Sequence, residues 1–161
     1  MERWIELVEF PGYSISDHGR VRNDRSGRLF VLQRNRAGVV YVGLVKDGRQ
    51  QKRSVAKLVA DVFLQKTVDH YDTPTHIDAD PSNNHYSNLT WRPRYFADAY
   101  HRQYNHWPRV GRPIRIVETG ERFQDSWEAC MKYVLLDIDI VKSITNGEVV
   151  RPIFKHFELA E

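Results

Sequence analysis

The segment 39–53 constrains the fold more than any other part of the sequence, because two strand-like runs there flank a strong turn signal. Residues 39–45 are rich in valine and lead directly into Lys46-Asp47-Gly48-Arg49. An Asp-Gly pair suits a tight type I′ turn, in which both central residues need positive φ. The segment therefore predicts an antiparallel hairpin.

A short amphipathic helix is expected after this hairpin, over residues 54–64. Apolar residues recur there at the spacing of one helical face, and Ser54 stands at the N-cap position. The apolar positions are Val55, Leu58, Val59, Val62 and Phe63. We interpret this face as structural, and we also expect Tyr41 and Trp91 to lie in the core.

The regions before and after these elements have different patterns. Residues 1–30 predict a small β unit, with a turn at Pro11-Gly12 and with Ile15 and Val21 facing its core. Residues 65–93 are polar and too long for an ordinary connector, so the chemistry should be sought there. Residues 94–112 begin as a helix and end in a segment punctuated by Pro and Gly, which indicates a boundary near residue 112.

The last part of the chain predicts a second hairpin followed by two short helices. Strand-like residues 114–117 and 122–123 flank a Thr119-Gly120 turn. Asp125 precedes Glu128 by three residues, as in a capping box, and a second helix over 138–145 should stop at Asn146-Gly147. Two short helices joined by a tight turn indicate a helix-turn-helix.

Charge is unevenly distributed along the chain, although the net charge is only +3. Residues 1–60 hold 12 Lys and Arg against 6 Asp and Glu, whereas residues 113–161 hold 6 against 9. The basic front can contact phosphates and attract a polyanion, and plain solvation of the surface is the alternative interpretation. The single cysteine, Cys130, is expected in the core. No stretch approaches the roughly 18 apolar residues of a membrane span, and no signal peptide is evident, so we expect a soluble cytoplasmic protein.

The segment from Thr75 to Trp91 resembles the HNH motif of phage and intron-encoded endonucleases. It reads His76-Ile77-Asp78, then Asn83-Asn84, then Asn88-Leu89-Thr90-Trp91. The resemblance extends over nearly the whole chain. Residues 13–22 resemble the N-terminal module associated with these nucleases, and residues 113–157 resemble a C-terminal helix-turn-helix module.

This resemblance implies two antiparallel strands and a helix around one divalent cation. The expected cofactor is Mg²⁺ if the protein is an active nuclease, and no cofactor is expected otherwise. The implied fold is α+β and modular, with an N-terminal β module (1–30), a ββα-metal domain (31–97), a linker (98–112) and a hairpin with a helix-turn-helix-like module (113–161). His76 matches the general base that deprotonates the attacking water, and Asn88 matches the residue that orients this base. Asp78 matches a carboxylate that closes the loop.

The sequence departs from the family pattern at the expected metal ligands. Thr75, with a neutral hydroxyl, stands before the histidine where Asp or Asn is usual. Ala97 stands on the helix where Asn or His is usual, and Ala79 replaces a glycine of the loop. No intact metal site is expected, and Thr75 and Asp98 are the candidate weak ligands.

Two functions remain open from the sequence. The first is a nucleic-acid-binding protein with a degraded metal site, kept as a binding or assembly component; the alternative is an active Mg²⁺-dependent DNA homing endonuclease that uses His76. A structural protein without nucleic-acid contact ranks third. DNA is the expected partner, structured RNA and a larger assembly are the alternatives, and no membrane partner is expected. The candidate nucleic-acid contacts are Arg20, Arg22, Arg25, Arg34, Arg36, Lys52, Arg53, Arg94, Arg102 and Lys142.

The predicted helix-turn-helix has its own candidate contacts. The second helix of such a module presents its N-terminal residues to the major groove, and here these include Asp137 and Asp139. Carboxylates repel phosphates, so only Lys142 and Asn146 look like ready contacts. Packing against a protein is the alternative role for this module.

Overall fold

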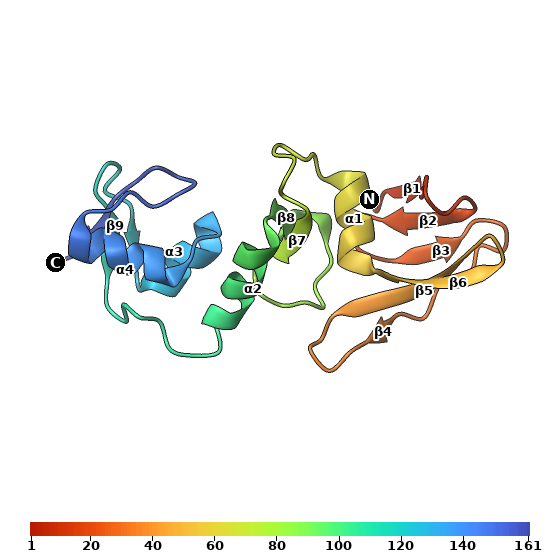
Figure 1. Ribbon diagram of the computed structural model, residues 1–161, viewed down its shortest axis with the longest axis horizontal. Coiled ribbons are helices and arrows are strands. Elements are labelled where there is room, and N and C mark those ends of the chain that lie inside the picture. The colour runs from red at the N-terminus through yellow and green to blue at the C-terminus, as the bar shows by residue number, and fades with distance from the viewer. The chain divides into compact units, whose positions relative to one another are not determined.

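The computed structural model describes residues 1–161, which divide into two compact units, Met1–Arg94 (unit 1) and Tyr95–Glu161 (unit 2) (Figure 1). No helix in the chain is long and apolar enough to cross a lipid bilayer. The elements of unit 1 are β1 (Trp4–Glu6), β2 (Tyr13–Ser16), β3 (Val21–Asn23), β4 (Gln33–Arg34), β5 (Val40–Lys46), β6 (Arg49–Ser54), α1 (Val55–Phe63), β7 (Thr73–His76), the 3₁₀ turn η1 (Tyr86–Asn88) and β8 (Leu89–Arg92). Helix α2 (Arg94–Gln103) begins at the boundary, and unit 2 continues with β9 (Ile114–Ile116), β10 (Arg122–Phe123), α3 (Ser126–Tyr133), α4 (Asp137–Asn146) and β11 (Phe157–Leu159).

The predicted hairpin is confirmed as β5 and β6. Asp47 and Gly48 join the two strands with φ of 51° and 71°, the positive values that the turn requires. Successive residues of β5 alternate between the two faces of the sheet, and Val40, Val42 and Leu44 are buried. Tyr41 therefore lies on the opposite face and is only partly buried, so the expectation that it is a core residue is wrong.

The N-terminal β unit is also confirmed, as the antiparallel sheet β1-β2-β3. Ile15 pairs with Val21, and both are buried as predicted. They belong to the same hydrophobic core as the hairpin, α1 and Leu89 of β8. Residues before and after residue 30, where the sequence predicts a module boundary, thus share one hydrophobic core.

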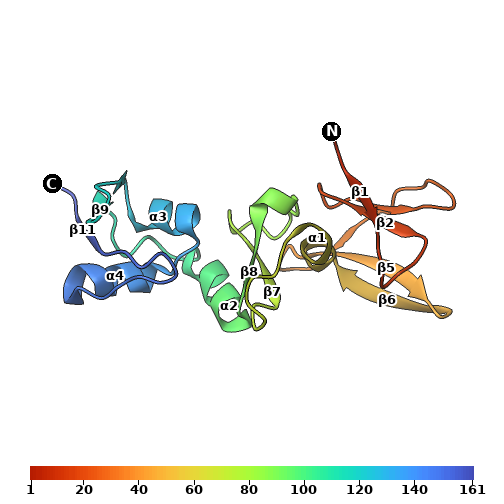
Figure 2. The same cartoon turned by 90° about the horizontal axis from the view of Figure 1, so that it is seen from above.

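Helix α1 connects the parts of unit 1 because it packs against β2, β5, β6, β7, β8 and η1. Figure 2 shows it nearly end-on, between the β5–β6 hairpin and the β7–β8 pair. Ser54 stands at its N-cap position as expected, but its side chain makes no capping hydrogen bond. Burial of Val55, Val59 and Ala60 rather than a side-chain cap therefore stabilises this helix.

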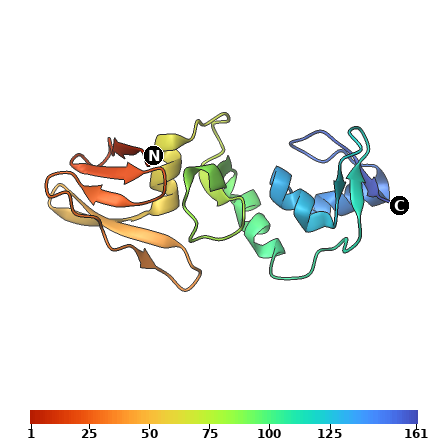
Figure 3. The ribbon, with the colours of Figure 1, turned by 180° about the vertical axis from the view of Figure 1, so that it is seen from behind.

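Unit 2 contains the predicted hairpin, β9 and β10, and the two predicted helices (Figure 3). Asp125 accepts a hydrogen bond from the Glu128 amide, as in the predicted cap, while the Glu128 carboxylate accepts one from the amide of Gln124. Gly147 ends α4 with φ of 69°. Strand β11, which was not predicted from the sequence, pairs with β9 and packs against α4.

The segment between α2 and β9 is anchored to unit 2. The amide of Val110 donates to the hydroxyl of Ser126 at 3.3 Å, and the amide of Arg109 donates to Asp137 at 2.9 Å. Asp137 is only 1% exposed, so it anchors this segment and does not face a DNA groove, which corrects the expectation for the start of α4.

Candidate active site and nucleic-acid interface

The two strands predicted around the histidine are confirmed. Strands β7 and β8 are antiparallel, with Thr75 opposite Thr90 and His76 opposite Leu89. Trp91 on β8 is buried, as predicted. The predicted helix follows Pro93 as α2, nearly all of which belongs to unit 2. The loop 77–88 therefore begins directly after His76 at the end of β7 and ends opposite it, where β8 begins.

The carboxylate of Asp78 closes this loop, as predicted. It accepts hydrogen bonds from the side-chain amide of Asn88 at 2.9 Å, from that of Asn83 at 2.7 Å and from the backbone amide of Asp80 at 2.9 Å. The Oδ1 of Asn88 accepts a return bond from the amide of Asp78 at 3.1 Å. Asn88 is thus a loop-closing residue.

Asn84, not Asn88, holds the histidine. The Nε2 atom of His76 lies 3.0 Å from Oδ1 of Asn84, and both residues are buried. The Nδ2 of Asn84 donates to the carbonyl oxygen of Ser82 at 3.2 Å, which fixes the orientation of the amide group. A neutral His76 therefore carries its hydrogen on Nε2, and Nδ1 is the atom that would accept a proton. The orienting role expected for Asn88 passes to Asn84.

The environment of His76 favours the neutral imidazole. Burial lowers the pKa of His76, and the Asn84 hydrogen bond and the nearby carboxylates of Asp78 and Asp80 oppose this only in part. A neutral histidine near pH 7 has the protonation state that a general base needs.

The N-terminal β unit supports the segment that carries Asn84. The amide of Tyr86 donates to the carbonyl oxygen of Asp17 at 2.8 Å. Gly19 packs so closely on this segment that an added Cβ would lie 2.8 Å from Cβ of Asn84. The ring of His18 meets that of His85, with centroids 4.6 Å apart. The turn at residues 17–19 therefore supports the segment that carries Asn84, a role that was not predicted from the sequence.

Asp17 fixes this turn in place. It is 4% exposed, and its carboxylate accepts bonds from the backbone amide of Arg3 at 3.1 Å and from the guanidinium of Arg3 at 2.9 Å. Burial alone would raise the pKa of Asp17, but these bonds outweigh it, so the pKa is lowered. The guanidinium of Arg3 also stacks 4.8 Å from the ring centroid of Tyr86. Arg3 and Asp17 together join the N-terminus to η1.

The residues at the expected metal-ligand positions do not fit a hard divalent cation. Thr75 is 0% exposed, and its buried hydroxyl is neutral and has no hydrogen-bond partner. Ala97 offers no donor atom, and Asp98 is exposed on α2 in unit 2. The chain contains no group of three or more His, Cys, Asp or Glu side chains that could hold a metal ion. Magnesium prefers several oxygen donors, which these positions do not supply.

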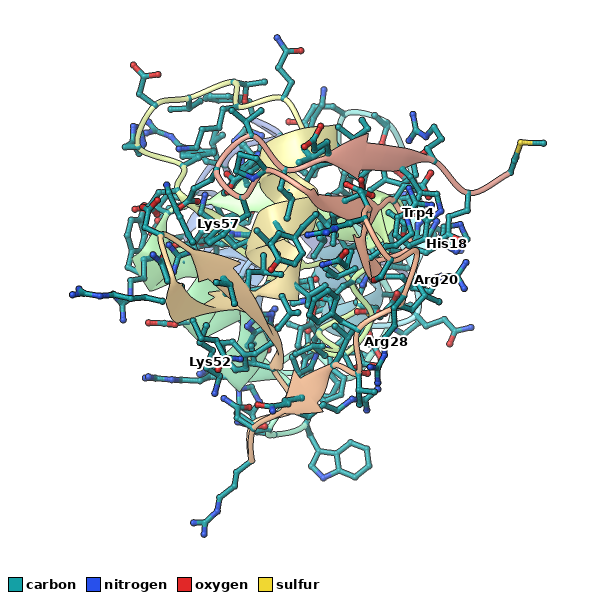
Figure 4. The ribbon with its side chains drawn as sticks, turned by 90° about the vertical axis from the view of Figure 1, so that its right-hand side faces the viewer. Trp4, His18, Arg20, Arg28, Lys52 and Lys57 are labelled. Atoms are coloured by element: carbon teal, nitrogen blue, oxygen red, sulfur yellow. The ribbon has the colours of Figure 1, made fainter.

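The labelled arginines and lysines of unit 1 lie on two sides of the view in Figure 4. Trp4, His18, Arg20 and Arg28 lie along one side, and Lys52 and Lys57 lie on the opposite side (Figure 4). The guanidiniums of Arg22 and Arg20 lie 4.6 Å and 5.8 Å from the ring centroid of Trp4. On the other side, the ammonium of Lys52 lies 4.3 Å from the ring centroid of Tyr41, on the exposed face of the β5–β6 sheet.

The ten candidate contacts fall into two groups. Arg20, Arg22, Arg53 and Lys142 form salt bridges with Glu2, Asp24, Glu9 and Asp139, respectively. Exposed cations without such a partner are better placed to bind phosphate, and these are Arg25, Arg34, Arg36, Lys52, Arg94 and Arg102. Asn146, the other expected contact of α4, donates to Glu148 at 3.0 Å.

Known proteins resemble this chain in sequence and fold. Residues 2–45 match the NUMOD4 motif. The uncharacterized HNH endonuclease L245 of Acanthamoeba polyphaga mimivirus is 29% identical over 128 residues, which cover 79% of this chain and 38% of that protein. The HNH endonuclease L247 of the same virus is 34% identical over 92 residues, covering 56% of this chain and 23% of that protein. The chain thus spans less than half the length of either relative.

A solved structure shares the fold over nearly the whole chain. It is a structure of the HNH homing endonuclease I-HmuI, concerned with DNA binding and cleavage by that enzyme. The two chains match with a TM-score of 0.57 and 19% sequence identity over 98% of each. The loop around His76, the N-terminal motif and these similarities agree with one another. In sequence and in fold, this chain is therefore similar to HNH homing endonucleases.

Proposed function

We propose that this chain binds DNA and that its site at His76 has little or no capacity for metal-dependent cleavage. The observation that carries the proposal is Thr75, which is fully buried and bears a neutral hydroxyl where the family resemblance implies a metal ligand. Ala97 removes the second expected donor. A bound cation would neutralise the charge that develops on a phosphate during hydrolysis, and these two positions supply no ligand for one.

Binding does not need the missing ligands. Surface cations attract the DNA backbone and release its counterions, a contribution that is independent of sequence and of metal. Unit 1 offers Arg25, Arg34, Arg36 and Lys52, exposed and without salt bridges. The resemblance to a structure described as binding DNA favours DNA over structured RNA. A role inside a larger nucleoprotein assembly is compatible with the same surface.

Salt-dependent binding of the full chain tests the proposal. Single variants Arg25→Gln, Arg34→Gln, Arg36→Gln and Lys52→Gln change exposed side chains only, so unit 1 should stay folded. Each cation that contacts a phosphate should reduce the slope of log affinity against log salt by about 0.9 when it is neutralised. Arg115→Gln is the matched control, since Arg115 is exposed and paired with Glu158 in unit 2. If none of the four variants changes the slope more than the control, this surface does not bind DNA.

An active Mg²⁺-dependent endonuclease is the second candidate. The observation in its favour is the neutral His76, whose Nε2 is held by Asn84 and whose pKa is lowered by burial. Such a histidine could accept a proton from an attacking water. Cleavage of DNA by the native chain that is lost in His76→Ala would favour this candidate over the first.

A further inference from the structure

Unit 2 contains an open concavity that the HNH site does not use. Its volume is about 320 Å³, and it is lined by Tyr104, Asn105, His106, Trp107 and Trp127. Four of these five side chains carry rings. The ring centroids of Tyr104 and Trp127 are 5.3 Å apart in an edge-to-face contact, and those of His106 and Trp127 are 6.5 Å apart. The concavity therefore has aromatic walls that pack against one another.

Trp107 stands out in this group because it is 87% exposed. A single exposed apolar side chain needs no explanation, but this one borders an aromatic concavity on an anchored segment. The carbonyl oxygen of Trp107 lies 2.6 Å from Nδ1 of His106. Pro108 fixes the next φ, and Val110 is bound to Ser126. The indole is thus presented to solvent by a defined backbone.

The chain segment that carries four of the five lining residues is cationic. Residues 99–113 contain Arg102, Arg109 and Arg112 and no Asp or Glu. Arg102 and Arg112 are exposed and form no salt bridge, and Nε of Arg109 lies 3.9 Å from the buried Asp137. Arg102, His106 and Arg109 also line a neighbouring concavity of about 280 Å³. An aromatic surface with such a rim is complementary to a ligand that combines a flat ring with negative charge.

We propose that this concavity is a stacking site for an unpaired nucleobase of bound DNA. The indole of Trp107 is the platform for the base, and Arg102, which lines the neighbouring concavity together with His106, neutralises an adjacent phosphate. Stacking of one base on an aromatic side chain is worth roughly tenfold or more in affinity, and it tolerates any base because every base has a π face. The proposal rests on the DNA binding proposed above and adds the class of DNA feature that unit 2 recognises.

The test compares three DNA probes by fluorescence anisotropy at one salt concentration. The probes are a short duplex, the same duplex with one bulged adenine, and one of its strands alone. The native chain should bind the bulged duplex more tightly than the intact one. Trp107→Ala should lose roughly tenfold in affinity for the bulged and single-stranded probes and less than twofold for the intact duplex, whereas Trp107→Phe should keep most of the affinity. Phe154→Ala is the matched control, because Phe154 is a 66% exposed aromatic residue near Arg151 and outside the concavity.

The outcomes separate this inference from the proposed function. If the native chain binds none of the probes, the proposed function fails, and the stacking site fails with it. If the native chain binds the intact duplex and Trp107→Ala has the same affinity as the native chain for each of the three probes, only the stacking site is refuted. Equal losses on intact and bulged duplexes would also overturn it, because Trp107 would then be a general contact. A further control measures binding to phosphatidylserine vesicles. If the native chain binds them and Trp107→Ala does not, while Trp107→Ala still binds bulged DNA normally, then the ligand of the concavity is a membrane surface and not a base.

Discussion

Replacing Gly19 with alanine should destabilise unit 1 far more than the same change at a glycine with open surroundings. Gly19 has φ of +78°, and a Cβ there would lie 2.8 Å from Cβ of Asn84, 3.2 Å from its carbonyl oxygen and 3.3 Å from Cγ1 of Val55. The positive φ costs an alanine about 1 kcal/mol. Forcing a methyl group into a packed contact costs a further 1–3 kcal/mol or so, which gives a total of about 2–4 kcal/mol.

Gly27→Ala isolates the effect of the close contact. Gly27 has φ of +70°, but nothing lies within 4 Å of its added Cβ, so this variant should lose only the roughly 1 kcal/mol due to backbone strain. Urea unfolding of both variants and of the native chain gives the two losses of free energy. In Gly19→Ala the displaced Asn84 should also shift the ¹⁵N resonance of Nε2 of His76, whereas Gly27→Ala should leave it unchanged. Equal losses of free energy in the two variants would refute the claim that the N-terminal turn supports Asn84.

Three further predictions concern single residues. Ala79 has φ of 60°, so Ala79→Gly should stabilise the chain by about 0.5–1 kcal/mol in urea unfolding, and a loss of stability would contradict the strain at this loop position. The pKa of His76 is lowered in the folded state, so the unfolded state binds more protons than the folded state once the pH falls below about 6.5. The free energy of unfolding should therefore decrease as the pH falls below that value. This fall should be smaller in His76→Gln, and identical pH profiles would show that His76 is not the group responsible. Burial raises the pKa of the Cys130 thiol, so a thiol reagent should modify it only after unfolding, and rapid labelling of the native chain would place Cys130 outside the core.

Local sequence signals predicted most of the secondary structure. Asp47-Gly48 located the β5–β6 turn because the turn type demands positive φ at both residues. Asp125 located the start of α3 because its side chain binds an amide only three residues away. Tyr41 was expected in the core, but the alternation of β5 in the folded sheet places it on the face opposite Val40 and Val42, where it is only partly buried.

What the sequence could not predict depends on contacts between distant residues. Asn84 and Asn88 are both asparagines in one loop, and only the folded loop shows which amide reaches His76. Likewise, the packing of Gly19 on Asn84 joins segments about 65 residues apart, and no local pattern encodes it. Asp137 resembles a helix-capping or groove-facing carboxylate in the sequence, and its burial against the amide of Arg109 requires the fold of unit 2.

Plasmid cleavage by the native chain at a concentration that saturates DNA binding tests the central claim most directly. With Mg²⁺ or Mn²⁺ present, the account predicts bound but intact plasmid, because Thr75 and Ala97 supply no ligand for the cation. The double variant Thr75→Asp with Ala97→Asn is the positive control. The cation should raise both the melting temperature of this variant and its cleavage of DNA. Adding His76→Ala should abolish that cleavage. Metal-dependent nicking by the native chain that disappears in His76→Ala would contradict the account.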